Sequence, residues 1–145
     1  MNQTTILHVE DDSNDVLLFE HACRKAGVDC TIRTVEDGDD AMDYLRGKGA
    51  FCDRNRYPMP QLILLDLKMP RLNGFEVLEL LRSEEQFRSI PIIVLSSSNH
   101  AADVRRAYAL GANSYLMKPV AFEALVEIVR SLNEYWIGLN VLAEV

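Results

Sequence analysis

The chain has 145 residues, of which 48% are hydrophobic and 26% charged, and its formal net charge at pH 7 is −7. This length fits one folded domain, and the composition is that of an ordinary globular protein rather than a disordered or membrane-embedded one. The negative charge, without a cluster of Lys and Arg, argues against a nucleic-acid-binding surface.

The sequence alternates five times between a strand pattern and a helix pattern. Each strand pattern is short and rich in aliphatic or β-branched residues, and each helix pattern repeats apolar residues at helical spacing. Because parallel neighbours in a sheet need helical crossovers, the alternation predicts a three-layer, doubly wound α/β domain. The predicted strands are 4–9, 30–35, 62–65, 91–95 and 114–117, and the predicted helices are 14–26, 39–46, 75–81, 99–110 and 122–136.

Two of the predicted helices have candidate caps at their starts. Asp12 or Ser13 can cap the first helix and Ser98 or Asn99 the fourth, because their side-chain oxygens can accept hydrogen bonds from free N–H groups. Segment 47–61 shows no clear periodicity, and we interpret it as an exposed loop, the longest connection in the chain.

The third predicted strand is a run of four aliphatic residues, Leu62–Leu65, that stops at Asp66. A run this short and apolar is typical of a parallel strand that is buried on both faces. Asp66 is therefore expected at the carboxyl edge of the sheet, where ligands of open α/β sheets bind.

Polar residues end the other strands as well. Glu10 and Asp11 follow the first strand, Ser96 follows the fourth and Lys118 the fifth, so these groups should converge on Asp66. Carboxylates so close together repel one another unless a cation is present. Oxygen ligands without His or Cys suit a hard divalent ion, which favours Mg²⁺ over Zn²⁺.

The chemistry that fits this set is attack by a carboxylate on a donor phosphorus, which forms an aspartyl-phosphate. Asp66 is the best candidate for the nucleophile because a buried strand holds it rigidly. Glu10 and Asp11 look like the metal-holding pair, while Lys118 and Ser96 would contact phosphoryl oxygens.

Taken in order, these motifs resemble the receiver domains of two-component response regulators over about residues 4–134. Ser96 and Lys118 follow Asp66 by 30 and 52 residues, as that family expects. The resemblance implies a flavodoxin-like (βα)5 fold with strand order 2-1-3-4-5, in a single receiver domain over 1–145 with an apolar extension at 135–145. The matching segments are Val9-Glu10-Asp11-Asp12, Asp66-Leu67-Lys68-Met69-Pro70 with Asn73-Gly74, Val94-Leu95-Ser96, Gly111-Ala112 and Tyr115-Leu116-Met117-Lys118-Pro119.

The resemblance also implies the function of the site. Asp66 would accept a phosphoryl group from a histidine kinase in a phosphorelay. Asp11, Asp66 and the backbone carbonyl of Lys68 would bind Mg²⁺, with Glu10 assisting mostly through water. The protein would be a phosphoacceptor that assists its own phosphorylation and dephosphorylation, and not an enzyme.

A conformational switch is a further implication of the resemblance. The hydroxyl of Ser96 would move onto the phosphoryl group and the ring of Tyr115 would turn inward. These movements would remodel the face formed by the fourth helix, the fifth strand and the fifth helix. The Lys118–Pro119 bond is expected to be cis.

Two features depart from the plainest receivers. The long loop 47–61 places Asp11 and Asp66 55 residues apart, and the chain ends without an effector domain. Both features, together with the ending Glu134–Leu139, resemble the stand-alone response regulators of bacterial and cyanobacterial phytochrome-type histidine kinases. We therefore expect a kinase of that type as the partner.

The C-terminal residues are too apolar for a free end in water. They either pack on their own domain or mediate self-association, and we expect a homodimer through the C-terminal face. The apolar residues in question are Tyr135, Trp136, Ile137, Leu139, Val141 and Leu142.

The cysteine pattern and the absence of targeting signals bear on the compartment. Cys23, Cys30 and Cys52 are odd in number and lack Cys-x-x-Cys spacing, and the sequence has no secretory signal and no run long enough to span a bilayer. We expect a cytoplasmic protein with reduced thiols and no membrane contact.

Three other functions can be weighed against the same residues. A phosphohydrolase with an Asp nucleophile typically has an acid two residues later, where this chain has Lys68. A flavodoxin-like cofactor binder needs a phosphate-cradling first loop, whereas Glu10-Asp11-Asp12 would repel phosphate. An adaptor that no longer takes phosphate would have no need for the intact constellation.

Overall fold

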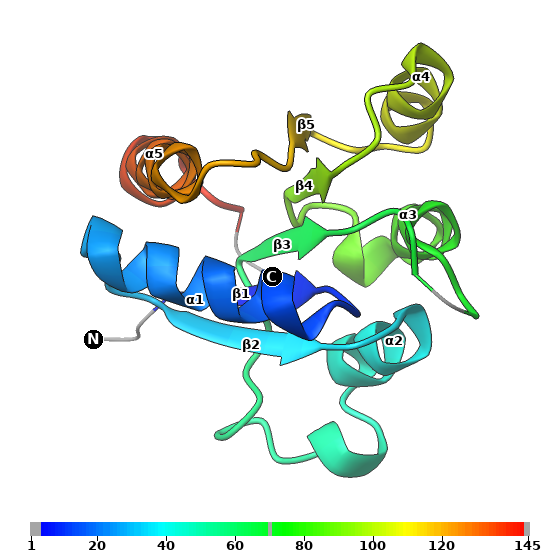
Figure 1. The fold of residues 1–145 in the computed structure, drawn as a ribbon. Helices are drawn as coiled ribbons and strands as arrows, with labels where there is room; N and C mark the ends of the chain where they lie inside the picture. The colour runs from blue at the N-terminus through cyan, green and yellow to red at the C-terminus, as the bar shows by residue number, and fades with distance from the viewer. Residues whose placement is uncertain (1–3, 70, 144–145) are drawn as a thin grey trace.

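Five parallel strands form one sheet in the order β2-β1-β3-β4-β5 (Figure 1), in a computed structural model that describes residues 4–69 and 71–143. Pro70 of the receiver-like motif and the outermost residues of the predicted 1–145 domain lie outside the described residues. The strands are β1 (Thr5–Val9), β2 (Thr31–Val35), β3 (Leu62–Leu65), β4 (Ile92–Ser96) and β5 (Ser114–Met117). The predicted doubly wound fold and its strand order are confirmed.

Helices cover both faces of this sheet. Figure 1 shows α1 and α5 on one face and α2, α3 and α4 on the other. The helices are α1 (Ser13–Ala26), α2 (Gly38–Arg46), α3 (Gly74–Ser83), α4 (Ala101–Ala109) and α5 (Phe122–Leu132), with short 3-10 helices at Gly49–Phe51 and Glu85–Phe87. Among the described residues, no helix is long and apolar enough to cross a bilayer.

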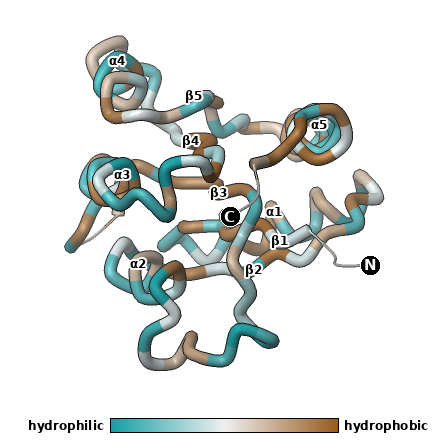
Figure 2. The backbone as a smooth tube through the Cα atoms, turned by 180° about the vertical axis from the view of Figure 1, so that it is seen from behind, coloured by the Kyte–Doolittle hydropathy of each residue, from teal (hydrophilic) through white to brown (hydrophobic). Residues whose placement is uncertain are grey.

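The sheet separates two hydrophobic cores, one under each helical layer. The side chains of β3 alternate between them, with Leu62 and Leu64 in the core beneath α1 and α5, and Ile63 and Leu65 in the other. All four are fully buried. Figure 2 shows hydrophobic residues along the central strands β3 and β4. Burial on both faces fixes β3, and therefore the position of the residue that follows it.

The caps of α1 and α4 differ in how well the sequence predicted them. Asp12 caps α1 as expected, because its side chain accepts hydrogen bonds from the backbone N–H groups of Asn14 and Asp15. The predicted cap of α4 was wrong. Its N-cap is His100, which makes no side-chain capping bond, while the Ser98 hydroxyl donates to the carboxylate of Asp103 at 2.6 Å.

Segment 47–61 is more ordered than the exposed loop that we predicted. The half-buried guanidinium of Arg54 donates to the backbone carbonyls of Tyr44 and Leu45, both at 2.6 Å, and to that of Tyr57 at 3.0 Å. The rings of Tyr44 and Tyr57 pack edge-on, with centroids 5.9 Å apart. Arg54 therefore ties the segment to the last turn of α2.

The chain after α5 continues as a π-helical segment, Asn133–Leu139, and not as the single helix that we predicted through residue 136. Trp136 and Ile137 pack against the core beneath α1 and α5. Tyr135, Leu139 and Val141 remain 52%, 69% and 93% exposed. The apolar C-terminal segment is therefore partly packed on its own domain and partly open to solvent.

Replacing Arg54 by Ala is expected to lower the free energy of unfolding by about 1–3 kcal/mol, because three carbonyls lose bonds to a charged donor. Arg56→Ala is the matched control, since Arg56 is exposed on the same segment and lies over the Tyr57 ring. That change should cost less than about 0.5 kcal/mol. Urea denaturation measures both variants, and equal losses would show that Arg54 does not hold the segment.

Candidate functional site

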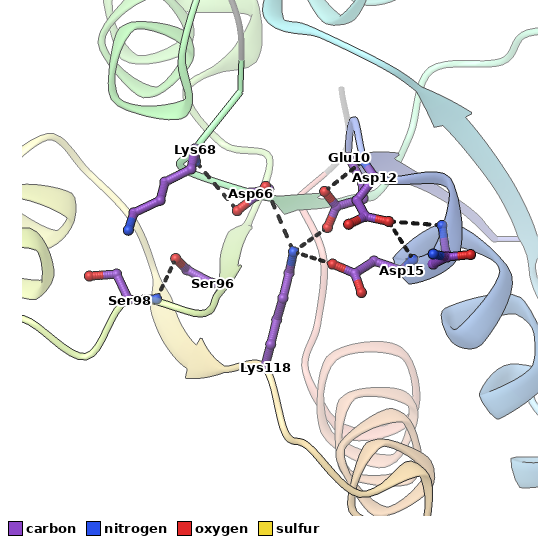
Figure 3. Close-up of polar contacts among 9 residues, drawn as sticks. Glu10, Asp12, Asp15, Asp66, Lys68, Ser96, Ser98 and Lys118 are labelled. Atoms are coloured by element: carbon purple, nitrogen blue, oxygen red, sulfur yellow. Dashed lines mark hydrogen bonds and ion pairs between the residues drawn. The ribbon is translucent and has the colours of Figure 1, made fainter.

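The acidic residues that the sequence singled out meet at the carboxyl edge of the sheet (Figure 3). Glu10 follows β1, and Asp66 follows β3, with 1% and 6% of their surfaces exposed. Asp11 is exposed beside them. One carboxylate oxygen from each of the three residues lies within 4.8 Å of the other two. The predicted convergence of the three acids is therefore present in the structure.

Lys118, which follows β5, extends its ammonium group into this acidic cluster. Its Nζ lies 2.5 Å from Glu10 Oε1, 2.8 Å from Asp15 Oδ2 and 3.7 Å from Asp66 Oδ2. The contacts with Glu10 and Asp15 are hydrogen bonds, whereas the distance to Asp66 is too long for one. Lys118 is therefore held between β1 and the first turn of α1.

Asp15 is the residue of the site that sequence reasoning missed. It lies in the first turn of α1, a position where an acid is common simply because it favours the helix dipole. Its place in the first turn of a helix that directly follows the first strand was the available signal, since that turn lies at the carboxyl edge of the sheet.

The backbone around Asp66 is held closely on both sides. The Asp66 N–H donates to the Val9 carbonyl at 3.0 Å, and the Gly74 N–H donates to the Leu67 carbonyl at 3.1 Å. A Cβ on Gly74 would lie 2.3 Å from the backbone oxygen of Asp66, so only glycine permits this approach of α3. The Lys68 N–H lies 3.4 Å from Asp66 Oδ1. These contacts fix the direction in which the Asp66 carboxylate points.

Burial changes the acidity of the whole cluster. It raises the pKa of Glu10 to about 7, although the hydrogen bond from Lys118 acts in the opposite direction. Burial also raises the pKa of Asp66 above its ordinary value, against the attraction of Lys118. For Lys118, burial opposes the charge, but hydrogen bonds to Asp15 and Glu10 outweigh it and raise the pKa. Ionisation of the two buried acids is therefore unfavourable in the free site, even with one ammonium group beside them.

The donor set fits a hard divalent cation. Three carboxylates supply only oxygen atoms, and cations such as Mg²⁺ and Mn²⁺ prefer oxygen ligands and retain several waters. Within 4–69 and 71–143, Glu10, Asp11 and Asp66 are the one group of three acidic, His or Cys side chains that lie close enough to share an ion.

Ser96 is the last residue of β4, and Tyr115 lies within the neighbouring strand β5. The fully buried Ser96 accepts a hydrogen bond at Oγ from the Ser98 N–H at 3.1 Å. The Tyr115 hydroxyl donates to the Ser98 carbonyl at 2.9 Å. Figure 3 shows the Lys68 side chain extending over this pair of serines. Ser98 thus connects the two residues that the resemblance assigns to a switch.

The prediction of a cis Lys118–Pro119 bond was wrong, because this peptide bond is trans. A trans bond before proline is the ordinary preference by about 0.5–1 kcal/mol. The turn is stabilised without a cis bond, since the Lys118 N–H donates to the Ser96 carbonyl at 2.8 Å.

Residues 6–130 match the family model of the response regulator receiver domain, and the chain belongs to this family. It is thus a receiver domain of phosphorelay signal transduction, similar to phytochrome response regulators.

Three relatives illustrate the similarity. The probable methanogenesis regulatory protein FilR2 of Methanothrix harundinacea is 39% identical over 93% of this chain and 84% of its own length. Response regulator Rcp1 of Synechocystis is 33% identical over 91% of this chain and 88% of its own, and its Mn²⁺-bound structure superposes with a TM-score of 0.86 over 97% and 99% of the two chains. The phosphorylated cyanobacterial phytochrome response regulator RcpA is 34% identical, with a TM-score of 0.90 over 99% of this chain and all of its own.

Divalent-metal binding is expected to weaken below about pH 7. The pKa of Glu10 is raised to about 7, so below this pH Glu10 is increasingly protonated and loses the negative charge that attracts the cation. The same shift has the opposite effect on the metal-free protein. Its folded state binds the proton more tightly than the unfolded chain, so this group's contribution to stability is complete at low pH and is lost as the pH rises from about 4.5 to about 7.

Thermal unfolding with Mg²⁺ and with chelator, followed from about pH 6 to 8, checks both effects. The Mg²⁺-induced rise in Tm should grow with pH in the natural protein. In Glu10→Gln this growth should be much smaller, because the titrating group is gone. A Mg²⁺ effect of equal size at all pH values would contradict the assignment of the pKa near 7 to Glu10.

Proposed function

We propose that Asp66 accepts a phosphoryl group from the phosphohistidine of a histidine kinase, with Mg²⁺ bound beside it. The observation that carries this proposal is the Lys118 ammonium group held between Glu10 and Asp15 and 3.7 Å from the buried Asp66 carboxylate. Two relatives support it, since RcpA was solved in a phosphorylated form and Rcp1 with Mn²⁺ bound.

The transfer requires an ionised Asp66. A carboxylate oxygen attacks the phosphorus in line with the phosphorus–nitrogen bond, which breaks and leaves its electron pair on the imidazole. Asp11, Asp66 and the backbone carbonyl of Lys68 would hold Mg²⁺, with Glu10 assisting through water. When bound, the cation neutralises charge on the phosphoryl oxygens.

Lys118 and Ser96 would stabilise the transferred group. The Lys118 ammonium and the Ser96 hydroxyl each donate a hydrogen bond to a different phosphoryl oxygen. Ser96 Oγ accepts a hydrogen bond from the Ser98 N–H, and the Tyr115 hydroxyl donates to the Ser98 carbonyl. Movement of Ser96 would therefore shift the Ser98 backbone and, with it, the hydrogen-bond partner of Tyr115. This path would carry the change to the face formed by α4, β5 and α5.

The kinase partner that we propose is of the phytochrome type. RcpA is named as a phytochrome response regulator, and it aligns with 99% of this chain. FilR2, which is named for methanogenesis, is 39% identical to this chain, compared with 34% for RcpA. A kinase of another signalling system is therefore the alternative. Rates of phosphotransfer from a purified phytochrome-type kinase and from an unrelated histidine kinase would separate the two.

Incubation with acetyl phosphate and Mg²⁺ is expected to add one phosphoryl group, seen by mass spectrometry of the intact protein. Asp66→Asn should gain none, because an amide cannot attack phosphorus, and chelation of the metal should reduce the gain strongly. Asp12→Asn is the matched control, since Asp12 is an exposed acid near the site and Asn caps a helix equally well. A phosphorylated Asp66→Asn protein would refute the assignment of the acceptor.

We also propose that the chain forms a homodimer through its C-terminal face. A groove of about 350 Å³ lies between β5, α5 and the residues that follow α5, and Leu116, Ile128, Tyr135 and Trp136 are among its lining residues. Its apolar lining and the exposed tyrosine at its rim favour contact with another apolar surface.

Sedimentation of the natural protein at micromolar concentration should show a dimer that Leu139→Asp converts to monomer, because a charge would be buried at the interface. Leu18→Asp is the control, since Leu18 is 45% exposed and lies on α1. A monomeric natural protein would exclude this interface.

We propose further that the protein acts on no separate substrate and works in the cytoplasm without binding nucleic acid or membrane. Lys68 stands where phosphohydrolases typically have their general acid, so turnover of small phosphate esters is expected to be negligible. The net charge of −7 would repel the phosphates of nucleic acid and of anionic lipids.

A further inference from the structure

Lys118 forms an ion pair with Asp15 of α1, a residue that has no role in the phosphoryl transfer described above. Its Nζ is 2.8 Å from Asp15 Oδ2 and 2.5 Å from Glu10 Oε1, but 3.7 Å from Asp66 Oδ2. Figure 3 shows the ammonium group in contact with the Glu10 and Asp15 carboxylates on one side and with the Asp66 carboxylate on the other. The ammonium group that is to bind a phosphoryl oxygen is therefore hydrogen-bonded to Glu10 and Asp15, and makes only a longer ion pair with Asp66.

We propose that Asp15 is a positioning residue that retains Lys118 beside α1 in the unphosphorylated protein and releases it when a phosphoryl group is attached to Asp66. This inference rests on the proposed function, because it requires Lys118 to contact a phosphoryl group on Asp66.

Burial decides which of the two hydrogen bonds breaks. Glu10 has 1% of its side chain exposed, so loss of its partner would leave a buried carboxylate without compensation, which is costly. Asp15 has 36% exposed, and water can solvate its carboxylate once Lys118 leaves. A dianionic phosphoryl group attracts the ammonium more strongly than Asp15 does. The bond to Asp15 is therefore the one that phosphorylation breaks.

The Lys118 side chain is loosely packed on the side that faces α1 and α5. A cavity of about 40 Å³ lies beside its side chain, and Asp15, Leu18, Phe19 and Pro119 are among its lining residues. In a closely packed interior a lysine stem would have to displace its neighbours in order to swing. Here one side of the stem faces space that is large enough for small rotations.

Release of Asp15 would also alter α1. The backbone N–H of Asp15 is held at 3.3 Å by the Asp12 cap, so its side-chain bond to Lys118 ties the capped first turn of α1 to β5. The neighbouring Leu17 and Leu18 are 53% and 45% exposed. Because coupling between two events is reciprocal, a partner that binds the carboxylate of Asp15 should in turn free Lys118 for the phosphoryl group.

The test uses beryllium trifluoride, an analogue of the phosphoryl group, with the full chain and saturating Mg²⁺. Asp15→Asn should bind it about two- to fivefold more tightly than the natural protein, because the variant has no ion pair to break. Asp12→Asn removes the same charge from the same helix turn but leaves Lys118 bound, so it reports the general effect of charge. Asp15→Glu should restore an affinity close to natural. Calorimetry measures all four proteins.

Hydrogen exchange supplies a second measurement. If Asp15 only stabilised the fold, the phosphoryl analogue would not change the exchange of the α1 amides. In the natural protein, beryllium trifluoride should speed exchange of the backbone amides in the second turn of α1. In Asp15→Asn these amides should exchange fast before the analogue is added and change little afterwards. Circular dichroism confirms that each variant is folded.

The possible outcomes separate this inference from the proposed function. If Asp15→Asn and Asp12→Asn bind the analogue equally, or if Asp15→Asn binds more weakly than the natural protein, Asp15 does not retain Lys118. If the natural protein neither binds the analogue nor takes a phosphoryl group from acetyl phosphate, the proposed function fails first, and the inference fails with it.

Discussion

The contact between the Lys118 ammonium and the buried acids determines how the rest of this structure must be arranged. Glu10 and Asp66 are almost fully buried and close together, and such a pair repels itself unless a positive charge lies beside it. The three groups come from the ends of β1, β3 and β5, which only a fully formed sheet brings together. The two cores beneath the helices hold those strands in place. The geometry of the site therefore depends on the packing of the cores.

The unfavourable ionisation of the two buried acids prepares the site for a cation. Burial raises the pKa of both Glu10 and Asp66, so the free site holds ionised acids at a cost that a bound cation would remove. A phosphoryl group would likewise compete for Lys118. The ammonium therefore has different partners in different states, and the exposed Asp15 is the partner that it can leave at the lowest cost.

The features that differ from the plainest receivers lie apart from this edge. Segment 47–61 joins the end of α2 to the start of β3, and the π-helical segment Asn133–Leu139 follows the end of α5, whereas Asp66 follows the carboxyl end of β3. Arg54 orders the first of these segments through three backbone carbonyls. Such additions can change partner or assembly without disturbing the charges around Asp66, which agrees with the high structural similarity to RcpA.

The sequence by itself determined the alternation of strands and helices, the buried third strand and the polar residues at the strand ends, because periodicity and strand termini are local properties of a chain. The tertiary structure decided everything that depends on which groups meet. It bound Lys118 to Asp15, gave Arg54 its three carbonyls and placed the α4 cap at His100. It also left the Lys118–Pro119 bond trans, which is the ordinary preference before proline. Long side chains such as Lys and Arg reach partners from other elements, and no local pattern specifies those partners.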